Sequence, residues 1–132
     1  MALQESVAVR NARLDAIETT IGVSAVLKIF SGAVPANCAA ADPAGLLCTI
    51  TLPSDWMAAA ASGVKAKSGT WSAAASAAGT ALSFRLYDSA GTVCGMQGTV
   101  GQGSGDLSLD NSNIANGQTV TVNTYSITAG NA

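Results

Sequence analysis

Short segments of alternating apolar and polar residues, separated by turn-forming residues, constrain this fold more than any other feature of the sequence. They begin at Ser24 and recur to the end of the chain. Alternation with a period of two places every second side chain on one face of a β-strand. About seven such segments, with turn residues roughly every 8 to 12 positions, are typical of an antiparallel sandwich or jelly roll. We therefore predict a mainly β chain that forms an antiparallel β-sandwich or jelly-roll-like domain.

The alternation and the turns place the expected strands. They cover residues 24–30, 46–52, 64–73, 80–87, 92–100, 107–109 and 119–127. In the fourth segment the apolar side chains are expected on the buried face and the others opposite, that is Leu82, Phe84 and Leu86 against Ser83, Arg85 and Tyr87. A turn signal at residues 88–91 predicts that the next strand pairs antiparallel with this one. A change of parity near Asn123 and Thr124 predicts a bulge in the last strand.

The N-terminal segment has a different period. Its apolar residues recur at spacings of four and three, as on one face of an α-helix. They are Leu3, Val7, Leu14, Ile17 and Ile21. Arg10 occupies the one position in this series where an apolar residue is expected. Gly22 is a typical C-terminal stop. The stripe must pack either on the chain's own sheet or on a neighbouring subunit. We therefore divide the chain into an N-terminal amphipathic helix (1–22) and one β-sandwich domain (23–132). If the stripe packs on a neighbouring subunit, the helix is an interface arm.

Two other segments interrupt the strands. Residues 54–63 begin with Ser54 and Asp55, which can cap a helix, and continue through Trp56, Met57 and four alanines. We predict a second, short helix there. Residues 31–45 contain two prolines and several turn formers, so a long loop is expected.

Low charge limits the functions that the chain can have. Charged residues make up 11% of the sequence and the net charge is −2, against about 25% charged residues in ordinary soluble domains. A weakly charged surface has little self-repulsion, which favours an assembly subunit packed with copies of itself. The Lys and Arg residues are scattered, which argues against nucleic acid as a ligand.

No apolar run reaches the roughly 18 residues that span a bilayer, and no signal peptide is visible. We therefore expect no association with a membrane.

The sequence offers little to catalysis. There is no histidine, which removes the commonest general base and metal ligand near neutral pH. Three dispersed cysteines do not complete a tetrahedral zinc site. We therefore expect no catalytic residue, no metal, no cofactor and no small-molecule substrate.

Three features have both a chemical and a simpler interpretation. Asp106 and Asp110 have the oxygen ligands that Ca²⁺ prefers, but as strand-end and turn residues they are expected to be solvated. The glycines of residues 101–105 lie between two strands, which is the wrong setting for a phosphate loop. Trp56 and Trp71 are expected to fill the core rather than to stack on a sugar.

The three cysteines are Cys38, Cys48 and Cys94. An odd number without motif spacing does not describe a disulfide framework. We expect them to be buried as small apolar side chains. The alternative is a Cys38–Cys48 disulfide, which would need an oxidising environment after cell lysis.

Five segments resemble small virion proteins of tailed bacteriophages. They are VRNARLDAIETTIG, SAVLKIFSGAVPANCAAADPAG, LPSDWMAAAASGVKAKSGTW, FRLYDSAGTVCGMQGTVG and GQTVTVNTYSITAGNA, and together they cover nearly the whole chain. The resemblance implies a virion component, made in the cytoplasm of the host bacterium, of the capsid decoration or cement type. In that family a β-sandwich or jelly-roll subunit clamps neighbouring major capsid proteins. It implies no catalytic residues.

The expected partner is therefore the phage major capsid protein, bound through the helix and the long loop. The residues expected to make these contacts are Leu3, Val7, Arg10, Leu14, Ile17, Ile21, Val34, Pro35 and Asp42. Two alternatives stay open. One is a neck or tail subunit of the virion, and the other is a carbohydrate-binding β-sandwich module that uses Trp56 or Trp71.

Overall fold

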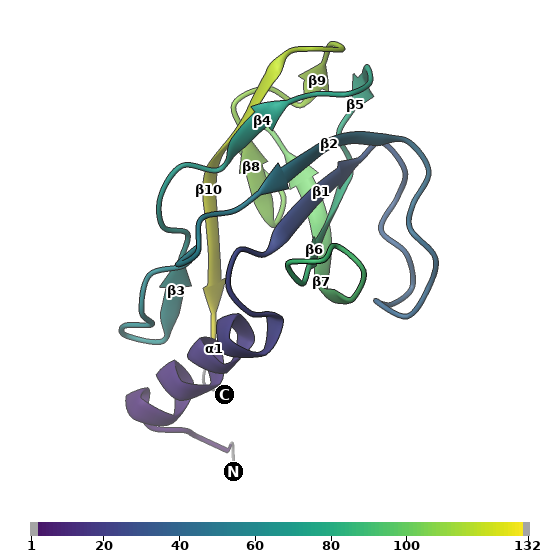
Figure 1. The fold of residues 1–132 in the computed structure, drawn as a ribbon. Coiled ribbons are helices and arrows are strands. Elements are labelled where there is room, and N and C mark those ends of the chain that lie inside the picture. Colours follow the sequence, from purple (N-terminus) through teal and green to yellow (C-terminus); the bar gives the residue numbers. More distant parts are fainter. Residues whose placement is uncertain (1–2, 131–132) are drawn as a thin grey trace.

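The computed structural model describes residues 3–130. Within that range the helix is α1 (Val7–Ile21) and the strands are β1 (Val26–Phe30), β2 (Leu46–Thr51), β3 (Val64–Ala66), β4 (Ser72–Ala74), β5 (Gly79–Thr80), β6 (Ser83–Tyr87), β7 (Cys94–Gly101), β8 (Leu107–Leu109), β9 (Asn113–Ile114) and β10 (Thr119–Thr128). Eight strands form one sheet in the order β2-β1-β6-β7-β8-β10-β3, with β4 also paired to β10, while β5 and β9 pair separately. Figure 1 shows the sheet curled on itself, with α1 at one end. The prediction of a mainly β chain with an N-terminal helix is confirmed.

The sheet is mixed, which corrects the expectation of purely antiparallel pairing. β7 and β8 run parallel, with Val100 opposite Leu107. Parallel neighbours usually need a connection of about a dozen residues, but here residues 102–106 suffice. Gly103 and Gly105 make the short return possible, because their φ angles of 70° and 80° are unfavourable for other residues.

Most strand positions predicted from the alternation are confirmed. β6 and β7 form the expected antiparallel pair. The expected bulge in the last strand is present as a register shift between Val122 and Thr124. The segment 64–73 is not continuous, because the chain turns at Gly69 (φ 73°). Its two halves, β3 and β4, pair with different parts of β10.

β6 lacks the alternating burial that its sequence predicts. All five of its residues are buried, whereas Leu82 just before it is 50% exposed. The long loop of residues 31–45 covers the second face, where the Arg85 guanidinium donates a hydrogen bond to the Asn37 carbonyl (3.1 Å). A polar side chain is buried there because the loop supplies its acceptors.

The predicted short helix at residues 54–63 is wrong. This segment is extended and forms a hairpin with β3, in which the Ala58 amide donates to the Ala66 carbonyl (2.9 Å). Ser62 and Gly63 make the turn with φ angles of 53° and 74°. Alanine favours helix by only tenths of a kcal/mol over most residues, roughly up to 0.7. The burial of Trp56 and Met57 in the core outweighs that preference.

α1 begins at Val7 instead of the predicted Leu3. Ser6 caps it, since its Oγ accepts a hydrogen bond from the Val9 amide (3.2 Å). The helix ends at Ile21 as predicted. The Gly22 amide then donates to the Glu18 carbonyl.

The core lies inside the curl of the sheet and is built around four aromatic rings. The ring centroids are 6.0 Å apart for Trp56 and Trp71, 5.7 Å for Trp71 and Tyr125, and 5.5 Å for Phe84 and Tyr125. Both tryptophans are fully buried, and their indole N–H groups donate to backbone carbonyls at 2.9 and 3.0 Å. Their predicted role in filling the core is confirmed. Neither offers a surface on which a sugar can stack.

Candidate functional site

Polar side chains attach one face of α1 to the hairpin that ends in β3. The acceptors are Asn11, Asp15 and Glu18, which bind the backbone amides of Gly63, Ala60 and Met57 at 2.9, 3.0 and 3.0 Å. Spacings of four and three place these acceptors on one helical face. Each satisfies a backbone donor of the hairpin, so the helix and the hairpin fix one another.

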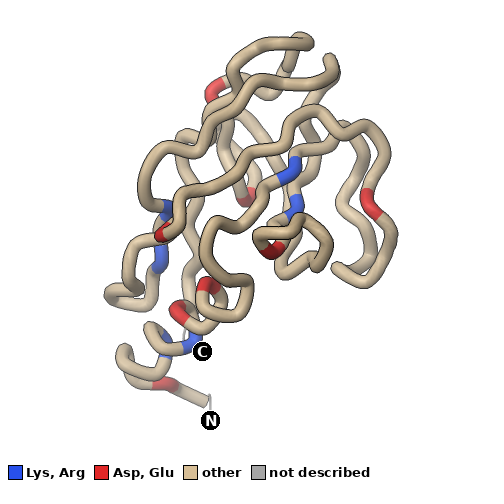
Figure 2. The backbone as a smooth tube through the Cα atoms, in the orientation of Figure 1, with Lys and Arg blue, Asp and Glu red and all other residues tan. Residues whose placement is uncertain are grey.

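A buried ion pair lies at the centre of this attachment. The Lys65 side chain is 1% exposed, and its Nζ lies 2.7 Å from Asp15 Oδ1 and 3.1 Å from Glu18 Oε1. Figure 2 shows acidic positions of α1 near a basic position of β3. Burial by itself would lower the pKa of Lys65, but the two carboxylates raise it overall. The hydrogen bond from Lys65 in turn lowers the pKa of Asp15, so both groups are charged at neutral pH.

The apolar stripe of α1 divides into a buried and an exposed part. Leu14 and Ile21 are buried and Ile17 packs against the core, so this part of the helix rests on the chain's own β structure. Arg10 is half-buried and its Nη1 donates to the Ala129 carbonyl (3.3 Å). The predicted contact with a partner stays a prediction for these four residues.

The exposed part of the N-terminal segment consists of three apolar side chains. Leu3, Val7 and Val9 are 82%, 47% and 48% exposed, and we refer to them as the N-terminal apolar residues. Leu3 and Val7 belong to the predicted contact set. Val9 lies off the stripe, and the periodicity therefore missed it.

Arg85 fixes the long loop on the other side of the sheet. Its side chain is 2% exposed. The guanidinium donates to Gln97 Oε1 (3.1 Å), the Ala40 carbonyl (3.0 Å), Asp42 Oδ1 (2.9 Å) and the Asn37 carbonyl (3.1 Å). These bonds hold a segment that has no strand of its own. The alternation assigned Arg85 to the outer face of its strand and gave no sign of this role.

Asp42 and Pro35 are part of the same attachment. The Tyr87 hydroxyl donates a short hydrogen bond to Asp42, and Gln97 Nε2 donates to the Pro35 carbonyl (2.7 Å). The Tyr87 hydroxyl and Arg85 lower the pKa of Asp42. Burial and the Asp42 carboxylate raise the pKa of Tyr87 to about 12. Asp42 stays exposed at its outer side, while Val34 and Pro35 are half-buried.

The cysteines are only partly as predicted. Cys48 is buried, with its thiol against the carbonyls of Ala73 and Ala74. Cys38 and Cys94 are half-buried, and their sulfur atoms lie 2.7 Å apart. A Cys38–Cys48 disulfide is therefore the wrong pairing, because Cys38 faces Cys94 and Cys48 points elsewhere.

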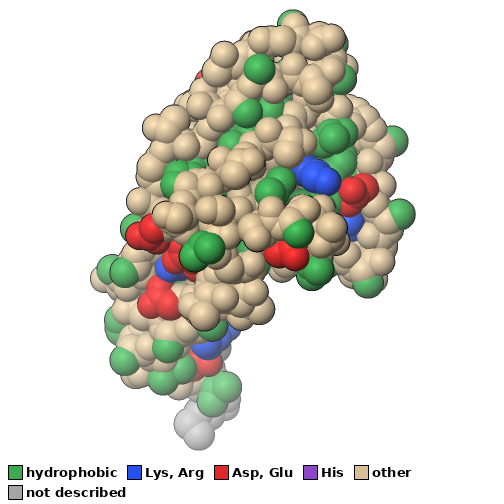
Figure 3. All heavy atoms as spheres, in the orientation of Figure 1, with side chains coloured by type: hydrophobic (Ala, Val, Ile, Leu, Met, Phe, Trp, Pro, Cys, Tyr) green, Lys and Arg blue, Asp and Glu red, His purple; other side chains and the backbone are tan. Residues whose placement is uncertain are grey.

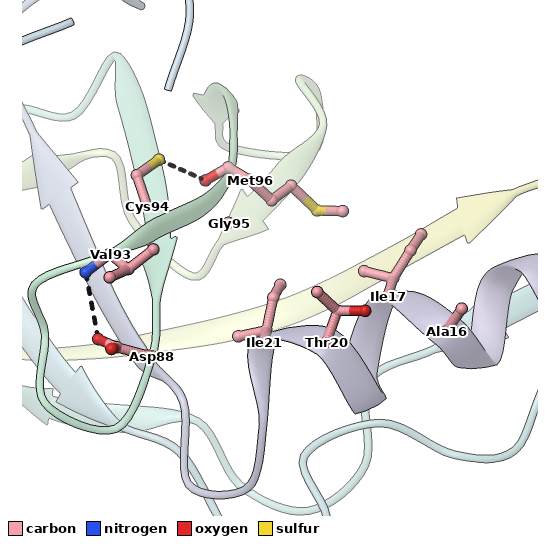
Figure 4. A pocket seen from close by; sticks show the side chains of 9 residues that line it. All are labelled: Ala16, Ile17, Thr20, Ile21, Asp88, Val93, Cys94, Gly95 and Met96. Atoms are coloured by element: carbon pink, nitrogen blue, oxygen red, sulfur yellow. Dashed lines mark hydrogen bonds between the residues drawn. The ribbon is translucent and has the colours of Figure 1, made fainter. Parts of the chain in front are cut away.

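A groove of about 550 Å³ lies between α1 and the start of β7. Figure 4 shows Ile17 and Ile21 of the helix pointing toward Gly95 and Met96 of the strand. The Asp88 carboxylate at its edge accepts hydrogen bonds from the turn amides of residues 92 and 93. A specific ligand pocket usually has a few polar groups that converge on its interior, and the groove's apolar lining does not fit that description.

The two acids considered for calcium do not form a site. Asp106 accepts hydrogen bonds from the amide and hydroxyl of Thr99, and Asp110 accepts from the amides of Asn111 and Thr121. Both carboxylates are thus occupied by donors of the chain itself, among them Thr99 in β7 and Thr121 in β10. In residues 3–130, no group of three or more His, Cys, Asp or Glu residues is arranged to hold a metal.

Comparison with protein-family models, curated proteins and solved structures finds no match to this chain. Across the described part of the chain, no helix has the length and apolar character needed to cross a bilayer. The contacts of α1 and of the long loop are the features on which a function can be argued.

Proposed function

We propose that the chain is a structural protein of a tailed-bacteriophage virion, a capsid decoration protein of the sandwich or jelly-roll type that binds the major capsid protein lattice. The N-terminal apolar residues carry this proposal, because they are exposed at the start of a helix, or just before it, and that helix is itself firmly attached to the domain. Exposed apolar side chains gathered on one segment are typical of contact with another protein. The resemblance of the five sequence segments supplies the class of partner.

The long loop supports the same function. Ordering a flexible loop on binding costs free energy. Arg85 and Tyr87 already hold residues 37–42 in place. The free-energy cost of ordering the loop when Val34, Pro35 and Asp42 bind a partner is therefore lower. A preformed loop is suited to repeated, identical contacts on a lattice.

Weak charge suits close packing of many copies. Figure 2 shows that the end of the molecule with β5 and β9 is almost free of charged residues. Figure 3 shows the surface hollowed between α1 and the turn that joins β6 to β7, with apolar side chains distributed over the helix.

A decoration protein would stabilise the capsid by adding interface area, roughly 800 Å² per partner at each contact. The added interface raises the free energy needed to separate capsid subunits.

Binding to phage heads tests the proposal. Heads of the cognate phage that lack this protein are mixed with the purified chain, sedimented, and assayed for bound copies. We expect saturable binding at hundreds of copies per head, and a bound number of only a handful would indicate a neck or tail subunit instead. Absence of binding would refute the proposal.

The double substitution Val7→Asp with Val9→Asp locates the contact. Acidic residues are favourable in the first turn of a helix, so α1 should persist. Loss of two apolar contacts is expected to weaken binding by tenfold or more, equivalent to about 1.4 kcal/mol. The matched control is Val93→Asp, because Val93 is 63% exposed in the turn between β6 and β7 and should bind as the wild type. Equal binding by both variants would rule out the N-terminal contact.

A further inference from the structure

Cys38 and Cys94 form a pair that the proposed function does not use. Cys38 lies in the long loop and Cys94 begins β7, 56 positions later, yet their sulfur atoms are in direct contact at 2.7 Å. We propose that this pair is a redox site, at which a small-molecule disulfide or peroxide oxidises the two thiols to a disulfide that cross-links the long loop to β7. The inference is independent of capsid binding.

The surrounding contacts hold both cysteines in place. Arg85 binds the carbonyls of Asn37 and Ala40, on either side of Cys38. Asn37 Oδ1 also accepts hydrogen bonds from the Ala39 and Ala40 amides (2.9 and 3.0 Å), which closes a turn around Cys38. Cys94 is fixed in β7 opposite Tyr87. Groups held in this way react as if at very high local concentration.

Accessibility separates this pair from the third cysteine. Cys38 and Cys94 are half-buried, whereas Cys48 is buried. Burial and the hydrogen bond with Cys38 raise the pKa of the Cys94 thiol to about 12. The thiolate is the nucleophile, and the same disulfide forms whichever of the two thiols attacks the oxidant first.

The reaction balances as a two-electron oxidation of the protein. The Cys38 thiolate attacks a sulfur of the small disulfide, forming a mixed disulfide and releasing one small thiol. Cys94 then loses its proton and attacks the Cys38 sulfur, which forms the Cys38–Cys94 bond and releases the second small thiol. With a peroxide, the Cys38 thiolate attacks one oxygen, breaks the O–O bond and releases the other oxygen as water or an alcohol, which leaves a sulfenic acid on Cys38. Cys94 then attacks the Cys38 sulfur, the S–S bond forms and the hydroxyl leaves as water.

The cellular setting determines when the bond forms. Small thiols keep cysteines reduced in the bacterial cytoplasm, whereas the medium outside the cell is oxidising. If the chain is a virion component, as the proposed function holds, the two thiols would stay reduced during assembly. The disulfide would then cross-link the long loop to β7 after lysis.

Peptide mapping tests the pairing. The purified chain is treated with excess oxidised glutathione, alkylated under denaturing conditions and digested with trypsin without reduction. Cys38 and Cys48 fall in the tryptic peptide 29–65, and Cys94 falls in peptide 86–132. We expect these two peptides to be joined and Cys48 to be alkylated as the free thiol. The wild-type chain is sufficient for this measurement. A bond within peptide 29–65, or glutathione adducts without any cross-link, would overturn the proposal.

Variants and thermal unfolding complete the test. Cys38→Ser and Cys94→Ser should each abolish the joined peptides, whereas Cys48→Ala should retain them. A disulfide that closes a loop of this length should raise the Tm by on the order of 10 °C. The gain should disappear on adding dithiothreitol and should be absent in Cys38→Ser. An unchanged Tm in the oxidised wild type would contradict a cross-link that restrains the fold.

Discussion

Lys65 and Arg85 are buried cations. Lys65 lies where α1 meets the sheet, and Arg85 lies where the long loop meets it. Lys65 is surrounded by two carboxylates of α1 and the Ala58 carbonyl, and Arg85 by acceptors of the long loop and Gln97. A buried charge without partners is unfavourable by several kcal/mol. The helix and the loop are thus required for the sheet to accept these two side chains.

Replacing Lys65 tests the first of these attachments. Lys65→Met keeps the length of the side chain but leaves Asp15 and Glu18 without their cation, and both are partly exposed and can be solvated. We therefore expect a loss of about 1–3 kcal/mol in the free energy of unfolding, measured by urea denaturation. Lys67→Met is the control, since the Lys67 ammonium donates to an exposed carbonyl and lies 5.9 Å from the centroid of the Trp71 ring, at the limit of a cation–π contact, so its loss should cost less than about 1 kcal/mol. Equal effects of both substitutions would contradict the role assigned to Lys65.

Sequence reasoning reached some of these residues and missed others for a physical reason. The large apolar side chains Trp56 and Trp71 were placed correctly in the core, because burial follows from residue type. The acidic partners of Lys65 and Arg85 lie more than 40 positions away in the sequence, and no local pattern reports such contacts. One signal was available: Asn11, Asp15 and Glu18 share a helical face, which marks a polar attachment beside the apolar stripe.

At the scale of elements, α1 meets β7 through a contact that depends on one glycine. A Cβ built at Gly95 would lie 2.6 Å from Ile21 Cγ1 and 3.0 Å from its Cδ1. Such distances are too short for carbon atoms in contact, which attract best at roughly 3.5–4.0 Å. The end of α1 can lie this close to the sheet because residue 95 has no side chain.

Gly95→Ala is therefore expected to push Ile21 out of its site. We expect the free energy of unfolding to fall by about 1–3 kcal/mol, as for other overpacked contacts, and the amides of α1 to exchange faster with deuterium. Gly130→Ala is the matched control, because a Cβ there meets no atom within 4 Å. Unchanged exchange in α1 would show that the helix does not depend on this contact.

The elements that were predicted wrongly share a cause. Alternation reports that one face of a strand is buried, but it does not report that a loop will cover the other, as residues 31–45 cover β6. The alanines of residues 58–61 favour a helix locally, but the pairing of this segment with β3 is decided by distant packing. Local preference is correct where it agrees with tertiary packing, as in α1 and β10.

At the scale of the whole molecule, three carboxylates link stability to pH. The pKa values of Asp15, Asp42 and Asp88 are lowered, respectively, by Lys65, by Tyr87 with Arg85, and by turn amides. A group whose pKa is lower in the folded chain stabilises it above the unfolded pKa of about 3.9 and loses that effect as the pH falls through the folded value.

We therefore expect the Tm to be constant near neutral pH and to fall steadily below about pH 4. Circular dichroism melts between pH 7 and pH 2 measure this. Asp88→Asn should lower the Tm at pH 7 but make the decline with acid shallower, because one of the three carboxylates is gone. A Tm that does not change down to pH 2 would show that these hydrogen bonds and ion pairs contribute little.

β10 has a consequence for how the chain acquires its structure. It comes after every other strand, yet β3, β4 and β8 all pair with it. While the ribosome is still adding residues 67–118, β3 and β4 have no edge to join, because their partner is β10, whereas β1, β2, β6, β7 and β8 can pair with one another as they emerge. Contacts between such distant residues form slowly. Closure of the sheet must therefore wait until residues 119–128 have left the exit tunnel, and until then the nascent chain exposes the apolar residues that later become its core.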